Sequence, residues 1–262
     1  MSRKVLLSAN EAVAWAACKA GCAVASAYPG TPSTEILEQV AKFKDSIYCE
    51  WGVNEKVSME VAIGASIAGA RALTAMKHVG LNVAMDPLMT YTYVGANGGL
   101  VVVTADDPGM HSSQNEQDSR NLVKFARAAL FEPADSQETF DMVQAAFEVS
   151  EQFQVPAFVR LSTRTSHTST VVDVGDDFGP GHPERKEYVK DIRRYIPVPM
   201  FARPQRLKAQ ERTAALRAFA GETPFNRVER GDDRLGIITS GVTYQYVKEV
   251  FPEFSVLKLG FT

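Results

Sequence analysis

The sequence predicts an α/β fold of the doubly wound type, with a mainly parallel sheet of about six strands. Two observations favour this fold. Short apolar runs alternate with helix-like patterns up to about residue 161, and such alternation is typical of βαβ units with helices on both faces of a sheet. The composition agrees, because 45% hydrophobic and 23% charged residues in a chain of 262 suffice for a sizeable core.

Strands and helices are expected in strict alternation. Apolar runs predict strands at residues 23–27, 47–50, 73–77, 100–104, 129–131 and 157–161. Periodic stretches predict helices at residues 10–20, 32–43, 55–70, 86–94, 117–126 and 136–153. Pro32 suits the first turn of its helix, and Ser136 is expected to cap the last helix because Glu138 follows it.

The chain is expected to have three parts. Residues 1–162 form the α/β domain. Residues 163–234 hold frequent prolines and charges with weak apolar periodicity, which predicts an extended arm with one helix near 205–219. Residues 235–262 predict two strands and one helix, which are too few to enclose a core. We therefore expect the start of a second α/β domain that is truncated here.

The composition excludes several classes of protein. The formal net charge of −3 leaves no basic excess for a nucleic acid or an anionic membrane partner. The N-terminus lacks the sustained apolar core of a signal peptide, and no apolar run is long enough to span a bilayer. Cys18, Cys22 and Cys49 show no CxxC spacing, so we expect thiols in a reducing cytoplasm, with the first two as small core residues, and no metal site.

Two motifs indicate the chemistry. The run YPGTPSTE at residues 28–35 places the Thr31 hydroxyl and open backbone amides at a helix start. The run NEKVSME at residues 54–60 places the Glu55 carboxylate at the start of the next helix. The first can position a small polar ligand, and the second supplies a buried acid. A thiamine diphosphate enzyme needs this pairing around the aminopyrimidine ring of its cofactor.

A resemblance to a known family rests on four longer stretches. They are SAYPGTPSTEILE, EWGVNEKVSMEVAIGASIAGARALTAMKHVGLNVAMDPLM, GGLVVVTADDPGMHSSQNEQDSR and LGIITSGVTYQYVKEVFPEFSVLKLG. In these stretches the chain resembles the alpha subunits of indolepyruvate ferredoxin oxidoreductases, within the pyruvate:ferredoxin oxidoreductase superfamily. The resemblance implies the pyrimidine-binding component of an enzyme that oxidatively decarboxylates a 2-oxo acid, such as indolepyruvate or another aryl pyruvate. The products would be an acyl-CoA and reduced ferredoxin.

Other motifs of the family do not occur in this sequence. The GDG motif with a downstream asparagine for magnesium is missing, and so are the CxxCxxCxxxC clusters; the nearest string, at residues 231–233, lacks the second glycine. The resemblance therefore implies that thiamine diphosphate is shared with another domain or subunit, and that magnesium and iron–sulfur clusters lie outside this chain. The implied partners are diphosphate-binding and ferredoxin-like domains or subunits, a beta subunit, coenzyme A and ferredoxin.

Glu55 is the main catalytic candidate. In the family, the glutamic acid at this position hydrogen-bonds to N1′ of the pyrimidine and favours the imino tautomer, whose 4′ nitrogen takes the thiazolium C2 proton. The alternative is a glutamate that only stabilises the start of its helix. Glu60 points elsewhere on the helix and is the second candidate.

The other candidates follow neighbouring strands, where ligands bind in open α/β sheets. Gly30 and Thr31 are expected to contact the cofactor or the 2-oxo acid, although Thr31 could instead cap a helix. Lys77 and His78 end the third strand and are further cofactor-binding candidates, and His111 lies in the loop after the fourth strand. Both histidines could relay protons or bind a carboxylate, or could be structural.

Arg120 is expected to hold the substrate carboxylate through a bidentate pair, since an arginine follows a similar His-Ser stretch in the pyruvate enzymes. Asp106 and Asp107 are adjacent and diverge in direction, so we expect turn residues and no metal site. Small residues in the helix at 55–70 predict close approach by either a partner backbone or the sheet. They are Ala62, Gly64, Ala65, Ala68, Gly69 and Ala70.

Two alternatives to the oxidoreductase stay open. A non-redox thiamine decarboxylase, or a transketolase-like half, would also lack clusters. A truncated, non-catalytic interaction module would keep the fold and only bind partners, and the end of the sequence at Thr262 motivates this alternative.

Overall fold

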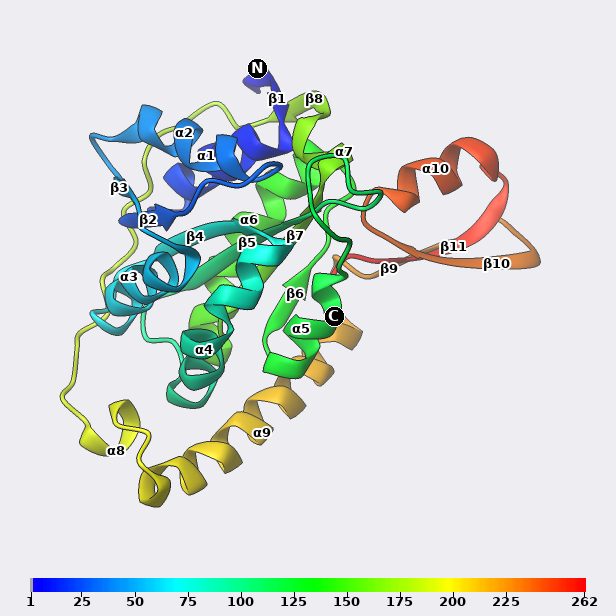
Figure 1. The fold of residues 1–262 in the computed structure, drawn as a ribbon. Helices are drawn as coiled ribbons and strands as arrows, with labels where there is room; N and C mark the ends of the chain where they lie inside the picture. Colours follow the sequence, from blue (N-terminus) through cyan, green and yellow to red (C-terminus); the bar gives the residue numbers. More distant parts are fainter. Residues whose placement is uncertain (1) are drawn as a thin grey trace.

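A six-stranded parallel sheet lies at the centre of the computed structural model, which describes residues 2–262 (Figure 1). The strand order is β3-β2-β4-β5-β7-β6, and every neighbouring pair is parallel. The strands are β2 (Val24–Ala27), β3 (Tyr48–Trp51), β4 (Ala72–Lys77), β5 (Leu100–Asp106), β6 (Ala129–Phe131) and β7 (Ala157–Ser162). All six match the predicted apolar runs, which confirms the predicted fold class.

Helices cover both faces of this sheet. They are α1 (Ala9–Lys19), α2 (Thr34–Val40), α3 (Glu55–Ile67), α4 (His78–Val94), α5 (Ser119–Ala126) and α6 (Ser136–Phe153). Helices α1, α2 and α6 share one hydrophobic core, and α3, α4 and α5 share the other. In β5, Val101 and Val103 belong to the first core and Leu100 and Val102 to the second, because successive side chains of a strand face opposite sides of the sheet.

Helix α4 starts earlier than predicted. It begins at His78, directly after β4, rather than at residue 86, and Pro87 lies inside it. The prediction placed Pro87 in a first turn, which proline favours. Leu81 and Ala84 are buried in the second core, so the apolar face of the helix already begins before the proline.

Two further helix starts differ by a few residues. Helix α2 begins at Thr34, so Pro32 precedes the helix instead of opening it. A short 3₁₀ turn, η1 (Ala41–Phe43), follows it. At α6 the N-cap is Asp135, whose carboxylate accepts a hydrogen bond from the Glu138 amide at 2.9 Å, and Ser136 is the first helical residue. Aspartate and serine are comparable N-caps, so the sequence alone does not choose between these neighbours.

The segment after β7 packs on the first part of the chain. Its elements are α7 (Thr163–His167), β8 (Ser169–Asp173), α8 (Ile192–Tyr195) and α9 (Pro199–Glu222). Strand β8 pairs with the N-terminal strand β1 (Lys4–Ser8) in a small antiparallel sheet. Helix α9 runs along α4, where Arg212 donates to the carbonyls of Thr92 and Tyr93 at 3.3 Å. It is the helix expected near 205–219, extended at both ends; the division into domain, arm and second domain stays a prediction.

The last residues form a small unit that returns to the central sheet (Figure 1). It consists of β9 (Arg227–Glu229), β10 (Asp232–Ser240), α10 (Thr243–Val250) and β11 (Phe254–Leu259), with the strand order β10-β11-β9. Thr262 exchanges two backbone hydrogen bonds with Leu130 of β6, at 2.9 and 3.0 Å. Buried Lys258 pairs with Glu138 of α6. Every helix within residues 2–262 is too short or too polar to cross a membrane.

Candidate functional site

The candidate residues lie at the carboxyl edge of the central sheet, at the ends of its strands or in the segments that follow them. Gly30 and Thr31 follow β2, Glu55 follows β3, Lys77 ends β4, and the loop from Asp107 follows β5. Because the strands are parallel, these loops share one edge, which is where open α/β sheets bind ligands. The topology therefore brings four separate stretches of sequence to one place.

Glu55 is the first residue of α3. The Asn54 side chain caps this helix by accepting a hydrogen bond from the Val57 amide at 2.9 Å. The Glu55 side chain is half-buried, and its carboxylate forms no hydrogen bond or ion pair with residues 2–262. Glu60, in contrast, is exposed. Of the two predicted acids, Glu55 is therefore the one that lies inside the site with its acceptor atoms free.

The turn after β2 is ordered by its own hydroxyl groups. The Gly30 amide donates to Thr34 Oγ1 at 2.9 Å, and Ser33 Oγ donates to the Gly30 carbonyl at 2.8 Å. The Thr31 side chain is exposed and does not cap α2, whose N-cap is Ser33. Gly30 faces the stem of Lys77, whose Cδ would lie 3.0 Å from a Cβ on that glycine. These contacts place Gly30, Thr31 and Lys77 together.

Lys77 and His78 hold the loop that follows β5. Lys77 Nζ donates to the Ser112 carbonyl at 2.9 Å. The His78 ring is buried, and its Nε2 lies 3.0 Å from the Asn115 carbonyl oxygen. His78 Nδ1 has no hydrogen-bond partner among the described residues. His111 is exposed at the tip of this loop.

Asp107 anchors the same loop from inside. Its carboxylate accepts hydrogen bonds from Ser112 N, Ser113 Oγ and Thr163 Oγ1, each at 2.7 Å. Burial acts to raise the pKa of Asp107, but these hydrogen bonds outweigh it and hold the pKa well below its usual range. Asp106 is also buried, as the last residue of β5. Both aspartates thus do more than form the expected turn.

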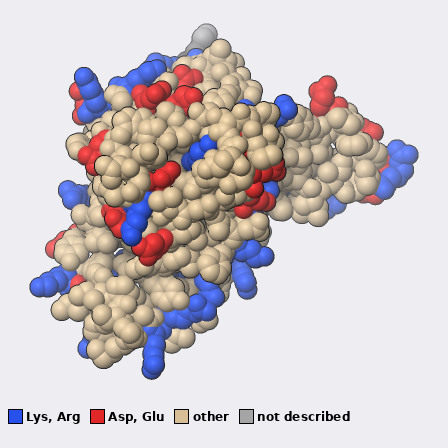
Figure 2. All heavy atoms as spheres, in the orientation of Figure 1, with Lys and Arg blue, Asp and Glu red and all other residues tan. Residues whose placement is uncertain are grey.

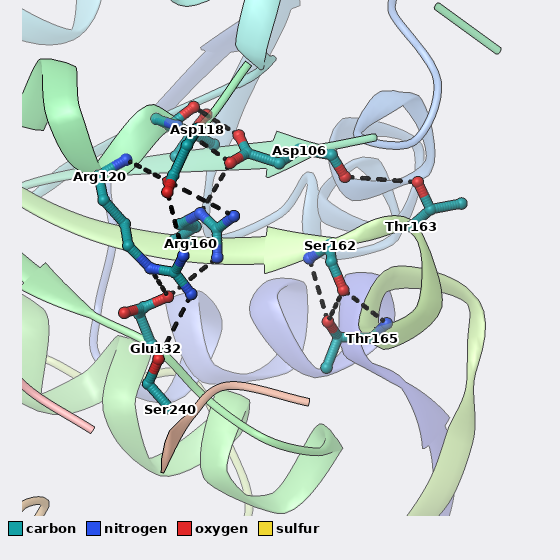
Figure 3. Close-up of polar contacts among 11 residues, drawn as sticks. Asp106, Asp118, Arg120, Glu132, Arg160, Ser162, Thr163, Thr165 and Ser240 are labelled. Atoms are coloured by element: carbon teal, nitrogen blue, oxygen red, sulfur yellow. Dashed lines mark hydrogen bonds and ion pairs between the residues drawn. The ribbon is translucent and has the colours of Figure 1, made fainter. Parts of the chain in front are cut away.

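Arg120 belongs to an ionic network at the ends of β5, β6 and β7 (Figure 3). Its guanidinium donates to Glu132 Oε1 at 2.8 Å, to Asp118 Oδ2 at 3.1 Å and to Ser240 Oγ at 3.3 Å. Arg160 of β7 donates to the same Glu132 oxygen at 2.9 Å and to Asp106 at 2.7 Å. A substrate carboxylate at Arg120 would have to replace one of these partners.

Sequence reasoning missed Glu132, Arg160 and Gly80 as residues of this edge. Glu132 directly follows β6, and Arg160 lies within β7; both strands are short and apolar. Burying a charge in such a strand is costly unless the charge is paired, so the sequence could have indicated an ion pair here. Gly80 lies in the first turn of α4 against the Glu55 carboxylate. The sequence offered no such signal for Gly80, because the helix was expected to start only at residue 86.

The pyruvate flavodoxin/ferredoxin oxidoreductase thiamine diphosphate-binding family model matches residues 15–213. The chain belongs to this family. Indolepyruvate oxidoreductase subunit IorA of Pyrococcus abyssi is 44% identical over 98% of this chain and 41% of its own length. The subunit of the same name from Methanothermobacter thermautotrophicus is 45% identical over 99% of this chain and 43% of its own length. The chain thus spans less than half of these relatives.

A solved structure agrees on the fold of this family member. The 2-oxoglutarate:ferredoxin oxidoreductase from Magnetococcus marinus matches 99% of this chain and 54% of that chain, with a TM-score of 0.77 and 17% identity. At that identity the likeness shows the fold alone. The carboxyl edge fits the pyrimidine end of thiamine diphosphate in one direct respect, because Glu55 offers a half-buried acid with no partner in residues 2–262.

Proposed function

We propose that this chain is the pyrimidine-binding component of a thiamine diphosphate-dependent 2-oxo acid:ferredoxin oxidoreductase. The observation that carries the proposal is the free, half-buried Glu55 carboxylate at the carboxyl edge of the sheet, in a chain of this family. The proposed reaction is oxidative decarboxylation of a 2-oxo acid to an acyl-CoA, with the electrons passed to ferredoxin. The names of the relatives support indolepyruvate, or another aryl pyruvate, as the substrate.

The residues of this chain would hold the pyrimidine end of the cofactor. Glu55 would share a proton with ring nitrogen N1′, as a positioned carboxylic acid can in general acid–base catalysis. The Thr31 hydroxyl and the backbone at Gly30 would bind polar atoms of the cofactor or the 2-oxo acid, and Lys77 and His78 would flank them. Thiamine diphosphate, when bound, supplies the carbon nucleophile and the electron sink for decarboxylation.

Two residues are proposed for the substrate carboxylate. His111 is exposed on the loop held by Lys77, so it could turn toward a bound 2-oxo acid. Arg120 could offer a bidentate pair only after releasing Asp118 or Glu132. His111 therefore needs less rearrangement than Arg120.

The remaining parts of the enzyme are proposed to lie outside this chain. Residues 2–262 contain no group of three histidine, cysteine or acidic side chains that could hold a metal ion. Burial raises the pKa of the Cys22 thiol to about 12, which suits a core residue and not a cluster ligand. We propose that diphosphate-binding and ferredoxin-like domains or subunits, together with a beta subunit, supply magnesium and the iron–sulfur clusters. Coenzyme A and ferredoxin complete the set of partners.

Reconstitution of the chain with these parts tests the proposal. The measurement is ferredoxin reduction that depends on indolepyruvate, coenzyme A and thiamine diphosphate. Glu55→Gln should lower the turnover by about 10² to 10⁴-fold, because the amide cannot exchange a proton at N1′. Glu60→Gln, at an exposed site on the same helix, is the matched control. Loss in Glu60→Gln with near-normal turnover in Glu55→Gln would move the role to Glu60.

A further inference from the structure

We infer that Gly80 is a positioning residue for the Glu55 carboxylate, because the missing side chain leaves the space in which that carboxylate lies. The inference rests on the proposed role of Glu55. Gly80 is buried in the first turn of α4, and Glu55 opens the neighbouring helix α3. The two residues are far apart in the sequence, and they meet because both helices start at the same edge of the sheet.

A side chain at residue 80 would overlap Glu55 in its present conformation. A Cβ on Gly80 would lie 2.5 Å from Glu55 Oε1, 2.7 Å from Cγ and 2.8 Å from Cδ. The three atoms nearest to that Cβ position all belong to Glu55. Rotation of the carboxyl group alone would not remove the overlap, because Cγ itself lies within it. Glu55 would have to adopt another χ1 rotamer and point its carboxylate elsewhere.

The backbone of Gly80 does not require glycine. Its φ lies outside the left-handed region, unlike that of Gly69 (φ 87°) or Gly95 (φ 81°). Alanine could adopt this conformation, and alanine is the better helix former. Space for Glu55 is therefore the reason that the structure offers for a glycine at this position.

The two helices cannot simply separate to admit a methyl group. Met59 and Ala62 of α3 and Leu81 and Ala84 of α4 are buried in the same hydrophobic core, so separating the helices would open that core. The start of α4 is held in turn by the contact between His78 and the Asn115 carbonyl. A substitution at residue 80 must therefore act on the Glu55 side chain.

A double-mutant cycle in this chain tests the contact without any cofactor. Gly80→Ala should raise the melting temperature in the Glu55→Ala background, because alanine favours the helix. It should raise it less, or lower it, when residue 55 is Glu. Gly221→Ala is the control, because it is a helical glycine with no atom within 4 Å of its Cβ position. If Gly80→Ala does not fold but Glu55→Ala/Gly80→Ala does, the inference stands. An equal change in melting temperature in both backgrounds overturns it.

The positioning role is tested in the assembled enzyme by deuterium exchange at C2 of bound thiamine diphosphate. Gly80→Ala should slow this exchange by about 10²-fold, the order of loss that a displaced catalytic group causes, with a smaller change in cofactor affinity. Exchange as fast as in Gly221→Ala would overturn the role. If the unmutated assembly neither binds the cofactor nor exchanges C2, the proposed function fails, while the melting experiment still decides whether Gly80 accommodates Glu55.

Discussion

At the residue scale, the Asp107 carboxylate holds the loop that carries His111, and the same hydrogen bonds stabilise the folded chain. Three hydrogen bonds hold its carboxylate in the charged form, so its pKa is lower in the folded chain than the ordinary value of 3.8. A lowered carboxyl pKa stabilises the folded state at every pH above the unfolded value. That contribution is lost as the pH falls below 3.8 toward the folded-state pKa.

We expect Asp107→Asn to lower the free energy of unfolding near neutral pH by about 1–3 kcal/mol, because it removes charge-assisted hydrogen bonds to a buried site. The difference from the unmutated chain should shrink near about pH 3, because the Asp107 carboxyl of the unfolded chain binds a proton below 3.8 while that of the folded chain stays charged. Urea denaturation at both pH values measures this. Asp45→Asn, at an exposed aspartate, is the control. A loss of the same size at both pH values would contradict the assignment of the stabilisation to the charge.

At the element scale, Arg160 joins three strands. It lies on β7 between β5 and β6, and it pairs with Asp106 at the end of β5 and with Glu132 after β6. Asp106 and Glu132 are almost completely buried, at 1% and 4% exposure. Arg120 extends the network to Ser240 of β10, so the small C-terminal unit is connected to the same edge (Figure 3).

Arg160→Met should lower the free energy of unfolding by about 3–5 kcal/mol, because it removes one partner of a buried ion pair and leaves acids without compensation. Equilibrium urea unfolding of the chain measures the loss. Arg234→Met is the matched control, since the Arg234 side chain is 79% exposed in its pair with Asp232 and should have no measurable effect. Equal behaviour of the two variants would show that Arg160 is not a structural link.

The ionic network around Arg160 also shows which contacts cannot be predicted from the sequence. The strands of the central sheet were predictable because strands buried on both faces appear as apolar runs, as in β5. The strands β1, β8 and β9, which lie outside this sheet, were not predicted. The position of Gly30, Thr31 and Lys77 at the carboxyl edge was predictable because each lies at or soon after the end of such a run. The pairing of Arg160 with Glu132 was not, since it depends on β7 and β6 being neighbours in the sheet. The contact between Gly80 and Glu55 depends in the same way on where two helices start.

At the scale of the whole molecule, two surfaces of different character could meet a partner. Lys and Arg side chains gather along the lower edge, where α9 lies (Figure 2). A cavity of 1010 Å³ between α5, α9 and the last residues includes Lys124, Arg127 and Arg217, and none of the described residues that line it is acidic. The edge near Glu55 exposes three large hydrophobic side chains, those of Tyr28, Trp51 and Val53, at 39%, 44% and 78%. The proposed function favours the second surface, because a cofactor shared between two domains lies at their interface.

Gly64→Trp distinguishes these surfaces. Gly64 is exposed on α3, and no atom lies within 4 Å of its Cβ position, so the isolated chain should melt as before. Ala65, beside it, packs against the second core and would be a poorer probe. If the diphosphate-binding partner covers α3, Gly64→Trp should abolish assembly and cofactor binding, which size-exclusion chromatography and calorimetry measure.

Gly221→Trp is the control. Gly221 lines the cavity between α5 and α9, and no atom lies within 4 Å of its Cβ position, so this variant should assemble normally. The opposite result, with assembly lost only in Gly221→Trp, would place the partner between α5 and α9 and leave the small residues of α3 as internal packing.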